Sequence, residues 1–342
     1  MVNRCGHALD YPAIVIDAHP PILFALNGSR AFGEAVATQL GWPLSAHEER
    51  EFEGGEHKAR PLVEVGNRDV YVIHSLAGDA CHSANDKLIR LLFFIGALKH
   101  AGAGRVTAVT PFLPYARKDR RTKPRDPVSM RYVAALFEAM ATDCLMTLEI
   151  HNIAAFENAF RTCRAENLPV AGILVDHILP LLGDSPVAVV SPDSGGAKRA
   201  ELFRSILEQR LGRPVGNAIL EKHRSAGVVS GSLFAGDVAG CVAIIVDDMI
   251  SSGGTIVRAA AACRTGGAIK VIAGAAHGLF TGGAPALFGN DGPDMVLVSD
   301  GVDVPAVAAP ERLQIVSAAK LFADAIARLS SGEAFYDLLP YD

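Results

Sequence analysis

Short apolar runs alternate with longer stretches of helical periodicity along most of the chain. The runs are rich in β-branched residues and too short to cross a membrane, which is typical of buried parallel strands. We expect strands at residues 21–26, 69–74, 105–110, 144–149, 187–190, 215–220, 242–247, 271–276 and 295–299. We expect helices at residues 29–40, 84–101, 129–139, 173–182, 196–210, 255–264 and 318–329. This alternation predicts an α/β fold in which each mainly parallel sheet is flanked by helices.

A polar segment divides this pattern into two halves of similar layout. Residues 161–169 are polar and end in proline, so we place the domain boundary there. The N-terminal domain then covers residues 21–163, and the C-terminal domain covers residues 164–323. Residues 1–20 precede the first expected strand and are interpreted as an N-terminal extension. A chain of 342 residues suits two domains of this size.

Composition and charge narrow the class of protein. Half of the residues are hydrophobic, which argues against disorder over most of the chain. The formal net charge is −5, so a nucleic-acid partner is not expected. The six cysteines are scattered without a Cys-x-x-Cys pair, which predicts reduced thiols in a cytoplasmic protein. The apolar patch at residues 13–16 is too short for a secretory signal or a membrane anchor, so neither is expected.

Residues 241–255 carry the clearest chemical signal. An apolar run ends in Asp247 and Asp248, and a Ser/Gly/Thr turn then opens an alanine-rich helix. Backbone N–H groups and hydroxyls at a helix N-terminus are suited to hold a phosphate, and the two glycines allow close approach of the backbone. Two carboxylates would repel a purely anionic ligand, so the pattern favours a phosphate that also bears hydroxyls or a metal, such as a sugar phosphate. A strand-to-turn transition with two solvated aspartates is the less favoured alternative.

Residues 110–128 form a second signal, a loop that follows an expected strand. Six cations lie in it: Arg117, Lys118, Arg120, Arg121, Lys123 and Arg125. In a chain of net negative charge, this concentration indicates a polyphosphate ligand or an acidic neighbouring subunit. The prolines of the loop stiffen it, which favours a shaped binding site over a merely solvated basic loop.

Three shorter segments add weaker signals. Asp193 ends a strand before a Ser-Gly-Gly turn at a helix entrance, although the spacing is not that of a Walker A loop. His151 follows another strand and could ligate a divalent metal or meet a phosphate, whereas a lone histidine is more often structural. Lys222 and Arg224 end a strand and enter Ser/Gly-rich sequence in which we expect little regular structure. They could close over a transferring phosphoryl group as a mobile flap; exposed surface cations are the commoner alternative.

Together and in this order, these segments resemble the ribose-phosphate diphosphokinases, also called PRPP synthetases. Residues 114–120, Pro-Tyr-Ala-Arg-Lys-Asp-Arg, resemble the family's Tyr-Ala-Arg-Gln-Asp-Arg stretch. Residues 191–196 resemble its Ser-Pro-Asp-x-Gly-Gly turn. Residues 246–255 resemble its PRPP-binding loop, which all type I phosphoribosyltransferases share. The likeness runs from about residue 25 to residue 342 and leaves the N-terminal extension uncovered.

The resemblance implies an architecture and an activity. It implies two tandem type I phosphoribosyltransferase-like domains, with the C-terminal tail, residues 324–342, packed on the first. It implies transfer of the diphosphoryl group of ATP to ribose 5-phosphate, with Mg²⁺ as cofactor and AMP as the second product. It also implies a homo-oligomer, a hexamer or a dimer, with sites shared between subunits.

Residue roles follow from the matching positions of the family motifs. The resemblance implies catalytic roles for Lys222 and Arg224. It implies ATP contacts for Arg117, Lys118 and Asp119, and for Phe52 and Glu56 of a neighbouring subunit. It implies ribose 5-phosphate contacts for Asp247, Asp248, Ser251, Ser252, Gly253, Gly254 and Thr255. It implies Mg²⁺ ligation by His151 and Asp193.

Four positions depart from the family pattern. Ser251 and Gly54 stand where aspartate is usual, Ser194 where histidine is usual, and His223 interrupts the usual Lys-Arg-Arg. The altered loop leaves open a paralogue that acts on another sugar phosphate. A catalytically silent regulatory homologue is less favoured, because the cations of the expected flap are retained. A phosphoribosyltransferase that consumes PRPP is disfavoured, since a transferase needs only one such domain.

Overall fold

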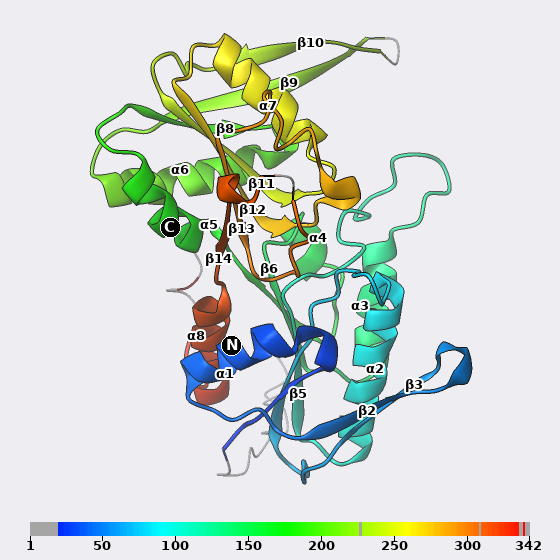
Figure 1. Ribbon diagram of the computed structural model, residues 1–342. Helices are drawn as coiled ribbons and strands as arrows, with labels where there is room; N and C mark the ends of the chain where they lie inside the picture. Colours follow the sequence, from blue (N-terminus) through cyan, green and yellow to red (C-terminus); the bar gives the residue numbers. More distant parts are fainter. Residues whose placement is uncertain (1–19, 226–227, 308, 335–337, 339–342) are drawn as a thin grey trace, which may run out of the picture.

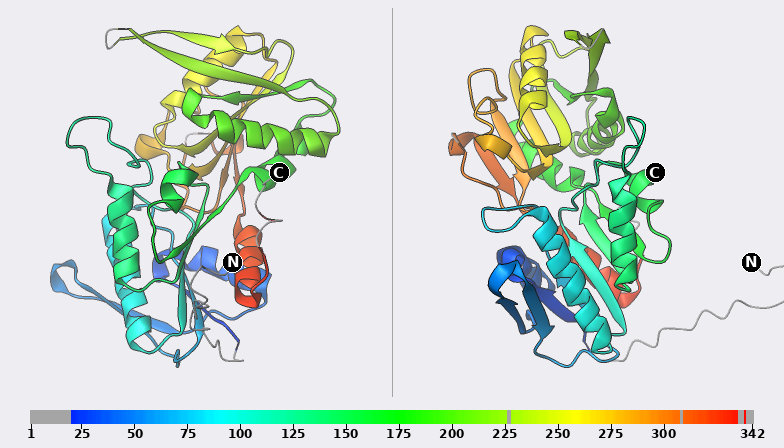
Figure 2. Two further views of the ribbon diagram at one scale, coloured as in Figure 1. Left: turned by 180° about the vertical axis from the view of Figure 1, so that it is seen from behind. Right: turned by 90° about the vertical axis from the view of Figure 1, so that its right-hand side faces the viewer.

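Two sheets, one from each half of the chain, form the framework of the molecule (Figure 1). The computed structural model describes residues 20–225, 228–307, 309–334 and 338, with the backbone alone for residues 221–225, 228–234 and 283. Of the expected extension, residues 1–20, only Pro20 belongs to the described part. The views in Figure 2 show the two sheets following one another along the long dimension of the molecule.

The first sheet is parallel throughout. In spatial order its strands are β1 (Ile22–Ala25), β4 (Asp69–Ile73), β5 (Arg105–Thr110), β6 (Cys144–Leu148) and β7 (Arg164–Leu168). One face is covered by α2 (Ala84–His100) and α3 (Ser129–Ala139), the other by α1 (Arg30–Leu40) and α8 (Ala319–Ser331). Side chains alternate along β1, so that Ile22 and Phe24 join the first helix pair while Leu23 and Ala25 join the second.

The second sheet is parallel except for one hairpin. In spatial order its strands are β10 (Val228–Ala235), β9 (Gly216–Ser225), β8 (Val187–Ser191), β11 (Val242–Ile250), β12 (Lys270–Gly278), β13 (Met295–Ser299) and β14 (Leu313–Val316). Only β9 and β10 are antiparallel among these described pairs. One face is covered by α7 (Gly254–Thr265), the other by α5 (Ala171–Ile178) and α6 (Ala197–Leu211). The expected α/β fold with mainly parallel, helix-flanked sheets is confirmed.

The end of the chain returns to the first sheet. Helix α8 lies against α1, where the rings of Phe32 and Phe322 meet edge to face with centroids 5.5 Å apart. Arg105 of β5 donates from Nη2 to the carbonyl oxygen of Leu329 over 2.9 Å. A single apolar core therefore runs from the first sheet past α1 and α8 to α5, α6 and the second sheet. The tail expected to pack on the first domain was residues 324–342. Its first part, residues 324–331, belongs to α8 and packs against α1 and the first sheet.

The segment expected to hold the domain boundary, residues 161–169, contains the end of the first sheet, but the boundary drawn after residue 163 lies one strand too early. Residues 164–168 form β7, which pairs in parallel with β6. Only Leu168 of this strand is buried, because β7 is an edge strand. An exposed edge strand carries polar residues and therefore resembles a linker in sequence. The first sheet ends at Leu168.

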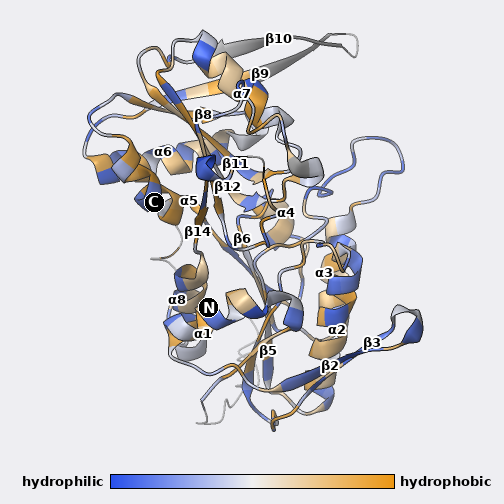
Figure 3. Cartoon of the chain, in the orientation of Figure 1, coloured by the Kyte–Doolittle hydropathy of each residue, from blue (hydrophilic) through white to orange (hydrophobic). Residues whose placement is uncertain are grey.

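A separate hairpin, formed by β2 (His47–Glu51) and β3 (His57–Pro61), was not predicted because its sequence is polar. It projects from the body beside α2, and Figure 3 shows hydrophilic colouring along much of it while the central strands are hydrophobic. Other described elements that were not expected are β10, β14 and the short helix α4 (Ile153–Glu157).

Two composition-based expectations can be compared with the structure. In the described part of the chain, no helix combines the length and apolar character needed to span a bilayer. The five described cysteines are unpaired, and Cys144, Cys163 and Cys263 are buried. Burial raises the pKa of Cys163 and of Cys263 to about 12. These thiols therefore act as apolar core groups rather than as nucleophiles.

Candidate active site

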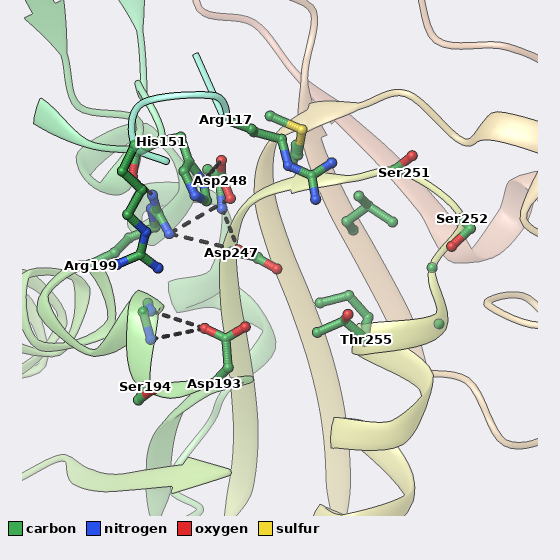
Figure 4. A pocket seen from close by; sticks show the side chains of 18 residues that line it. Arg117, His151, Asp193, Ser194, Arg199, Asp247, Asp248, Ser251, Ser252 and Thr255 are labelled. Atoms are coloured by element: carbon green, nitrogen blue, oxygen red, sulfur yellow. Dashed lines mark hydrogen bonds and ion pairs between the residues drawn. The ribbon is translucent and has the colours of Figure 1, made fainter. Parts of the chain in front are cut away.

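A cavity of about 930 Å³ opens where strand ends from both sheets meet (Figure 4). It is lined by Arg117, Arg120, His151, Arg199 and residues 193–196 and 247–256. The residues predicted to bind the sugar phosphate and the metal thus line one cavity, although they come from three separate segments of the sequence.

The cavity lies where the second sheet reverses its direction of winding. Strands β8 and β11 are parallel neighbours. The chain leaves β8 through α6 towards β9 on one side, and leaves β11 through α7 towards β12 on the other. Such a reversal leaves a crevice between the carboxyl ends of the two strands, which is where open α/β sheets bind ligands.

The loop from β11 to α7 has the geometry of an anion-binding turn. Gly253 has a φ of +79°, and a Cβ added there would lie 3.0 Å from Cβ of Leu287. Both facts favour glycine at this position. The first turn of α7 contains no acidic residue, so no carboxylate of the helix competes with an anion at its positive end. At the start of the loop, Oγ of Ser251 lies 2.9 Å from Oγ1 of Thr281.

The adjacent carboxylates Asp247 and Asp248 have different environments. Asp248 is only 3% exposed, and its Oδ2 accepts a 2.8 Å hydrogen bond from Nδ1 of His151. Burial alone would raise the pKa of Asp248, but the hydrogen bond from His151 and the charge of Arg199 outweigh it and lower the pKa. Burial, followed by the hydrogen bond and charge of Asp248, raises the pKa of Asp247. The pair therefore joins a firmly ionised carboxylate to one that takes up a proton more readily.

Arg199 crosses the back of this acidic pair. Its Nε donates to Oε1 of Glu149 over 2.9 Å, and its Nη1 lies 3.7 Å from Oδ1 of Asp247 and 3.8 Å from Oδ1 of Asp248. Its Nη2 also donates to the carbonyl oxygen of His151 over 3.4 Å. Sequence analysis assigned no role to Arg199 or Glu149. One signal was present, since Arg199 lies in the first turn of α6, where the helix dipole disfavours a cation.

The predicted metal ligands, His151 and Asp193, both line the cavity. Oδ1 of Asp193 accepts hydrogen bonds from the backbone N–H groups of Gly195 and Gly196 over 3.0 and 3.2 Å. The bond from His151 to Asp248 uses Nδ1, so Nε2 is the ring nitrogen that a metal would take; a carboxylate commonly orients a ligating histidine in this way. Among the described residues no group of three or more His, Cys, Asp or Glu side chains forms a metal cage. The pair fits Mg²⁺ that takes its other ligands from water and phosphate oxygens.

The departure at Ser194 lies in the same turn. Ser194 begins a short 3₁₀ turn, residues 194–196, between Asp193 and α6, and it lines the cavity beside Asp193 in Figure 4. A histidine, the usual residue of the family here, would have added a second imidazole to this edge of the cavity. The donor set of this chain is correspondingly richer in oxygen.

The basic segment reaches the cavity through Arg117 and Arg120. Lys118 and Asp119 are not among the described lining residues. Oδ2 of Asp119 instead accepts a 2.6 Å hydrogen bond from Nδ2 of Asn152, which joins the segment to the start of α4. The ATP contacts of Arg117, Lys118 and Asp119 stay predictions. Of these three residues, Arg117 is the one that lines the cavity among the described residues.

Phe52 and Glu56 follow β2 and precede β3 at the tip of the projecting hairpin, and neither is a described lining residue of the cavity. Phe52 is 41% exposed, and the guanidinium carbon of Arg50 lies 5.0 Å from the centre of its ring. Gly54, between them, has a φ of +83°, which the family's usual aspartate would adopt at a cost. The tip therefore presents an exposed aromatic ring away from the cavity of its own chain. Its contribution to a neighbouring subunit stays a prediction.

The hairpin is held at its base by a buried carboxylate. The side chain of Glu49 is 8% exposed and accepts hydrogen bonds from Nε2 of His47 and Nε2 of His57, each over 3.0 Å. The backbone N–H of Asn27 donates to the same carboxylate over 2.6 Å. Burial opposes ionisation of Glu49, but these hydrogen bonds lower its pKa to about 2.

Lys222 and Arg224 lie on the backbone of β9, which continues to Ser225 and pairs with β10. The expectation of little regular structure here was therefore wrong, since residues 216–225 and 228–235 pair as antiparallel strands with a register shift between Val229 and Ser232. Their side chains, and that of His223, are outside the described part of the chain, so their catalytic roles stay predictions.

Comparison with models of protein families gives two matches. Residues 21–141 match the N-terminal domain of ribose phosphate pyrophosphokinase, and residues 230–339 match the phosphoribosyl synthetase-associated domain. The two matches together cover more than half of the chain and include both the hairpin tip and the anion-binding turn.

Individual relatives are similar over nearly their whole length. The ribose-phosphate pyrophosphokinase of Mycoplasma pneumoniae is 33% identical, over 94% of this chain and 97% of the relative. That of Bradyrhizobium diazoefficiens is 35% identical, over 92% of this chain and 96% of the relative. The crystal structure of phosphoribosylpyrophosphate synthetase from Mycobacterium smegmatis superimposes with a TM-score of 0.82 and 30% identity, over 92% of this chain and all of that one. The similarity thus covers nearly the full length of each of these relatives.

Proposed function

This chain belongs to the ribose-phosphate pyrophosphokinase family, and we propose that it transfers the β,γ-diphosphoryl group of ATP to the anomeric hydroxyl of ribose 5-phosphate, giving PRPP and AMP. The resemblance drawn from the motifs is thereby confirmed at the level of family, fold and enzyme class. One observation carries the specific proposal. A single cavity combines an anion-binding turn, a carboxylate pair and two candidate metal ligands at the switch point of the sheet.

Two parts of the β11–α7 connection bind the sugar phosphate: the neutral turn at residues 251–255 and the acidic pair Asp247 and Asp248. The turn formed by residues 251–255 holds the 5-phosphate through its hydroxyls and the N–H groups that open α7. The ribose hydroxyls are held by the carboxylates. Of these, Asp247 has the more accessible side chain, with 21% exposed against 5% for Asp248, so Asp247 faces the sugar more directly. Ser251 adds a neutral hydroxyl where the usual aspartate of the family would add a charge.

The reaction requires an in-line displacement at the β-phosphorus of ATP. The anomeric oxygen forms a bond to this phosphorus, the bond to the oxygen bridging the α- and β-phosphorus atoms breaks, and AMP leaves with that oxygen. The proton of the anomeric hydroxyl is released. Such a transfer depends on alignment and on neutralising negative charge rather than on a protein nucleophile. Arg117 and Arg120 supply positive charge at the cavity wall, and Lys222 and Arg224 supply more if their hairpin closes over it.

Mg²⁺ is the proposed cofactor, with Asp193 and His151 as its protein ligands. When bound, it would neutralise charge on the phosphoryl oxygens of ATP. The hydrogen bonds from Gly195 and Gly196 fix the Asp193 carboxylate, and Asp248 orients His151, so both ligands are held before substrate arrives.

We further propose that the protein acts as a cytoplasmic homo-oligomer. Phe52 and Glu56 would complete the adenine site of a neighbouring copy. The support is their place on an exposed hairpin tip, outside the cavity of their own chain.

The proposed function is tested by supplying ATP, Mg²⁺ and ribose 5-phosphate to the purified protein. We expect AMP and PRPP in equal amounts, measured by anion-exchange chromatography. The variant Lys222→Ala tests the proposed catalytic cation. It should keep the unfolding temperature of the wild type and lose turnover by about a hundredfold or more, because one cation that stabilises the transition state is removed. AMP formation with another pentose phosphate but not with ribose 5-phosphate would replace the proposed substrate. No AMP with any sugar phosphate would favour the silent regulatory alternative.

A further inference from the structure

Arg199 joins the two halves of the molecule at the back of the cavity. Glu149 and His151 follow β6 of the first sheet, whereas Arg199 lies in the first turn of α6 and Asp247 lies in β11 of the second. One guanidinium therefore contacts residues of both sheets. Its side chain is 12% exposed, and that of Glu149 is 10% exposed, so water screens these charges weakly.

Glu149 is itself held in a defined position. Its Oε2 accepts a 2.9 Å hydrogen bond from the backbone N–H of Val170, while its Oε1 receives Arg199. The backbone of Glu149, directly after β6, has a φ of +45°, which lies in the left-handed region. A residue other than glycine adopts this conformation only when the surrounding structure holds it there. The anchor of Arg199 on the first sheet is thus rigid.

Arg199 contacts its acidic neighbours unequally. Three carboxylates, those of Glu149, Asp247 and Asp248, approach one guanidinium. The ion pair with Glu149 is a direct hydrogen bond, whereas the 3.7 and 3.8 Å approaches to the aspartates are longer. The aspartates are therefore held in place by Arg199 without being fully occupied by it, which leaves their oxygens able to accept hydrogen bonds from a ligand in the cavity.

From this geometry we infer that Arg199, anchored by Glu149, is a positioning residue for the sugar phosphate. It holds Asp247 and Asp248 at the orientation that receives the ribose hydroxyls and fixes them relative to the first sheet, on which Arg117 and His151 lie. The inference rests on the proposed function and deepens it, because it names the group that organises the sugar side of the cavity. Lysine would not replace Arg199 fully, since its single ammonium lacks the planar fork that reaches Glu149 and the aspartates together.

The test compares Arg199→Gln and Arg199→Lys with wild type in steady-state kinetics with each substrate varied. For Arg199→Gln we expect the KM for ribose 5-phosphate to rise about 10- to 100-fold, the range found when a residue that orients a ligand-binding group is removed. The KM for ATP should change by less than about threefold, because the predicted ATP contacts lie on residues 117–119, with which Arg199 forms no described hydrogen bond or ion pair. Arg199→Lys should recover part of the loss. Glu149→Gln, which keeps the size of the anchor, should shift the sugar KM in the same direction and less.

Arg204→Gln is the matched control. Arg204 lies on the same helix and pairs with Glu201 and Glu208, none of which lines the cavity among the described residues. Its kinetic constants should equal those of wild type. Isothermal titration with ribose 5-phosphate alone provides a second readout that does not depend on turnover.

The outcomes separate the inference from the proposed function. Unchanged sugar KM and sugar affinity in Arg199→Gln, with only a lower unfolding temperature, would show a purely structural ion pair and overturn the inference. Equal rises in both KM values would overturn it as well. Absence of AMP formation by wild type would count against the proposed function itself.

Discussion

Gly253 shows how one backbone conformation shapes the anion-binding turn. Its left-handed φ of +79° and the 3.0 Å distance between an added Cβ and Cβ of Leu287 both disfavour a side chain. We expect Gly253→Ala to raise the KM for ribose 5-phosphate about tenfold, because the added methyl group displaces the N–H groups that meet the phosphate. The free energy of unfolding should fall by about 1 kcal/mol from backbone strain.

Gly212 provides the control for this prediction. It ends α6 with a φ of +64°, but a Cβ added there meets nothing within 4 Å. Gly212→Ala should show a similar loss of stability in chemical denaturation and an unchanged sugar KM. If the KM for ribose 5-phosphate were the same in both variants, the prediction that the backbone conformation of Gly253 is needed for phosphate binding would be wrong.

Residues of the site differ in how far sequence could predict them. Asp247 and Gly253 lie within one short segment whose strand, turn and helix can be interpreted locally, and the structure places them in the cavity as expected. Arg199 and Glu149 could not be paired in this way, since fifty positions separate them and they meet only when two sheets pack together. Contacts of that kind depend on the tertiary arrangement and leave no local pattern.

At the scale of elements, the β2–β3 hairpin depends on the charge of Glu49. The folded-state pKa of about 2 lies below the ordinary value of 4.5, so the ionised form stabilises the fold. This contribution is fully present above about pH 4.5 and is lost as the pH falls towards 2. It amounts to at most about 3 kcal/mol, and to less once solvent screening is counted.

We therefore expect Glu49→Gln to be less stable than wild type at pH 7 and to lose less stability between pH 5 and pH 3. Thermal unfolding across this range measures both effects. Glu48→Gln is the control, because Glu48 lies next to it on β2 and pairs with Arg60 through an exposed contact. Parallel stability curves for wild type and Glu49→Gln would show that the buried carboxylate does not stabilise the hairpin.

The elements that sequence predicted well are strands buried on both faces and a helix with a clear apolar face. Strands β5 and β13 and helix α3 were expected with the bounds that the structure has, because continuous apolar runs and a clear helical period define them. The missed elements are polar or lie at edges. β2 is His-Glu-Glu-Arg-Glu, and β7 buries only Leu168, so neither shows the alternation that marks a half-buried strand.

At the scale of the whole molecule, the position of the hairpin tip predicts that active sites are shared between copies. Phe52→Ala and Lys222→Ala should each abolish most of the activity alone. Mixed after reversible dissociation, they should regain roughly a quarter of wild-type activity, since random assembly gives some sites both native residues. Measuring AMP formation against the mixing ratio tests this.

The control mixes Lys222→Ala with a chain that carries both substitutions, for which no site can regain both residues. No recovery in the first mixture would place Phe52 and Lys222 in the same subunit's site. Restored activity in the control would show that the recovery does not come from sites that combine the two native residues. Neither the oligomer nor its contacts could be derived from local sequence patterns. The exposed ring of Phe52 becomes informative only when the structure separates it from the cavity of its own chain.

The return of α8 to α1 has a consequence for how the protein is made. The first sheet is synthesised early, yet one of its faces is covered by a helix that is synthesised only after the whole second sheet. Until then, Phe32 and its apolar neighbours stay open to water and to other nascent chains. Folding of the N-terminal half is thus completed only after α8 has been synthesised, so a nascent chain that stalled within the second sheet would leave this apolar face uncovered.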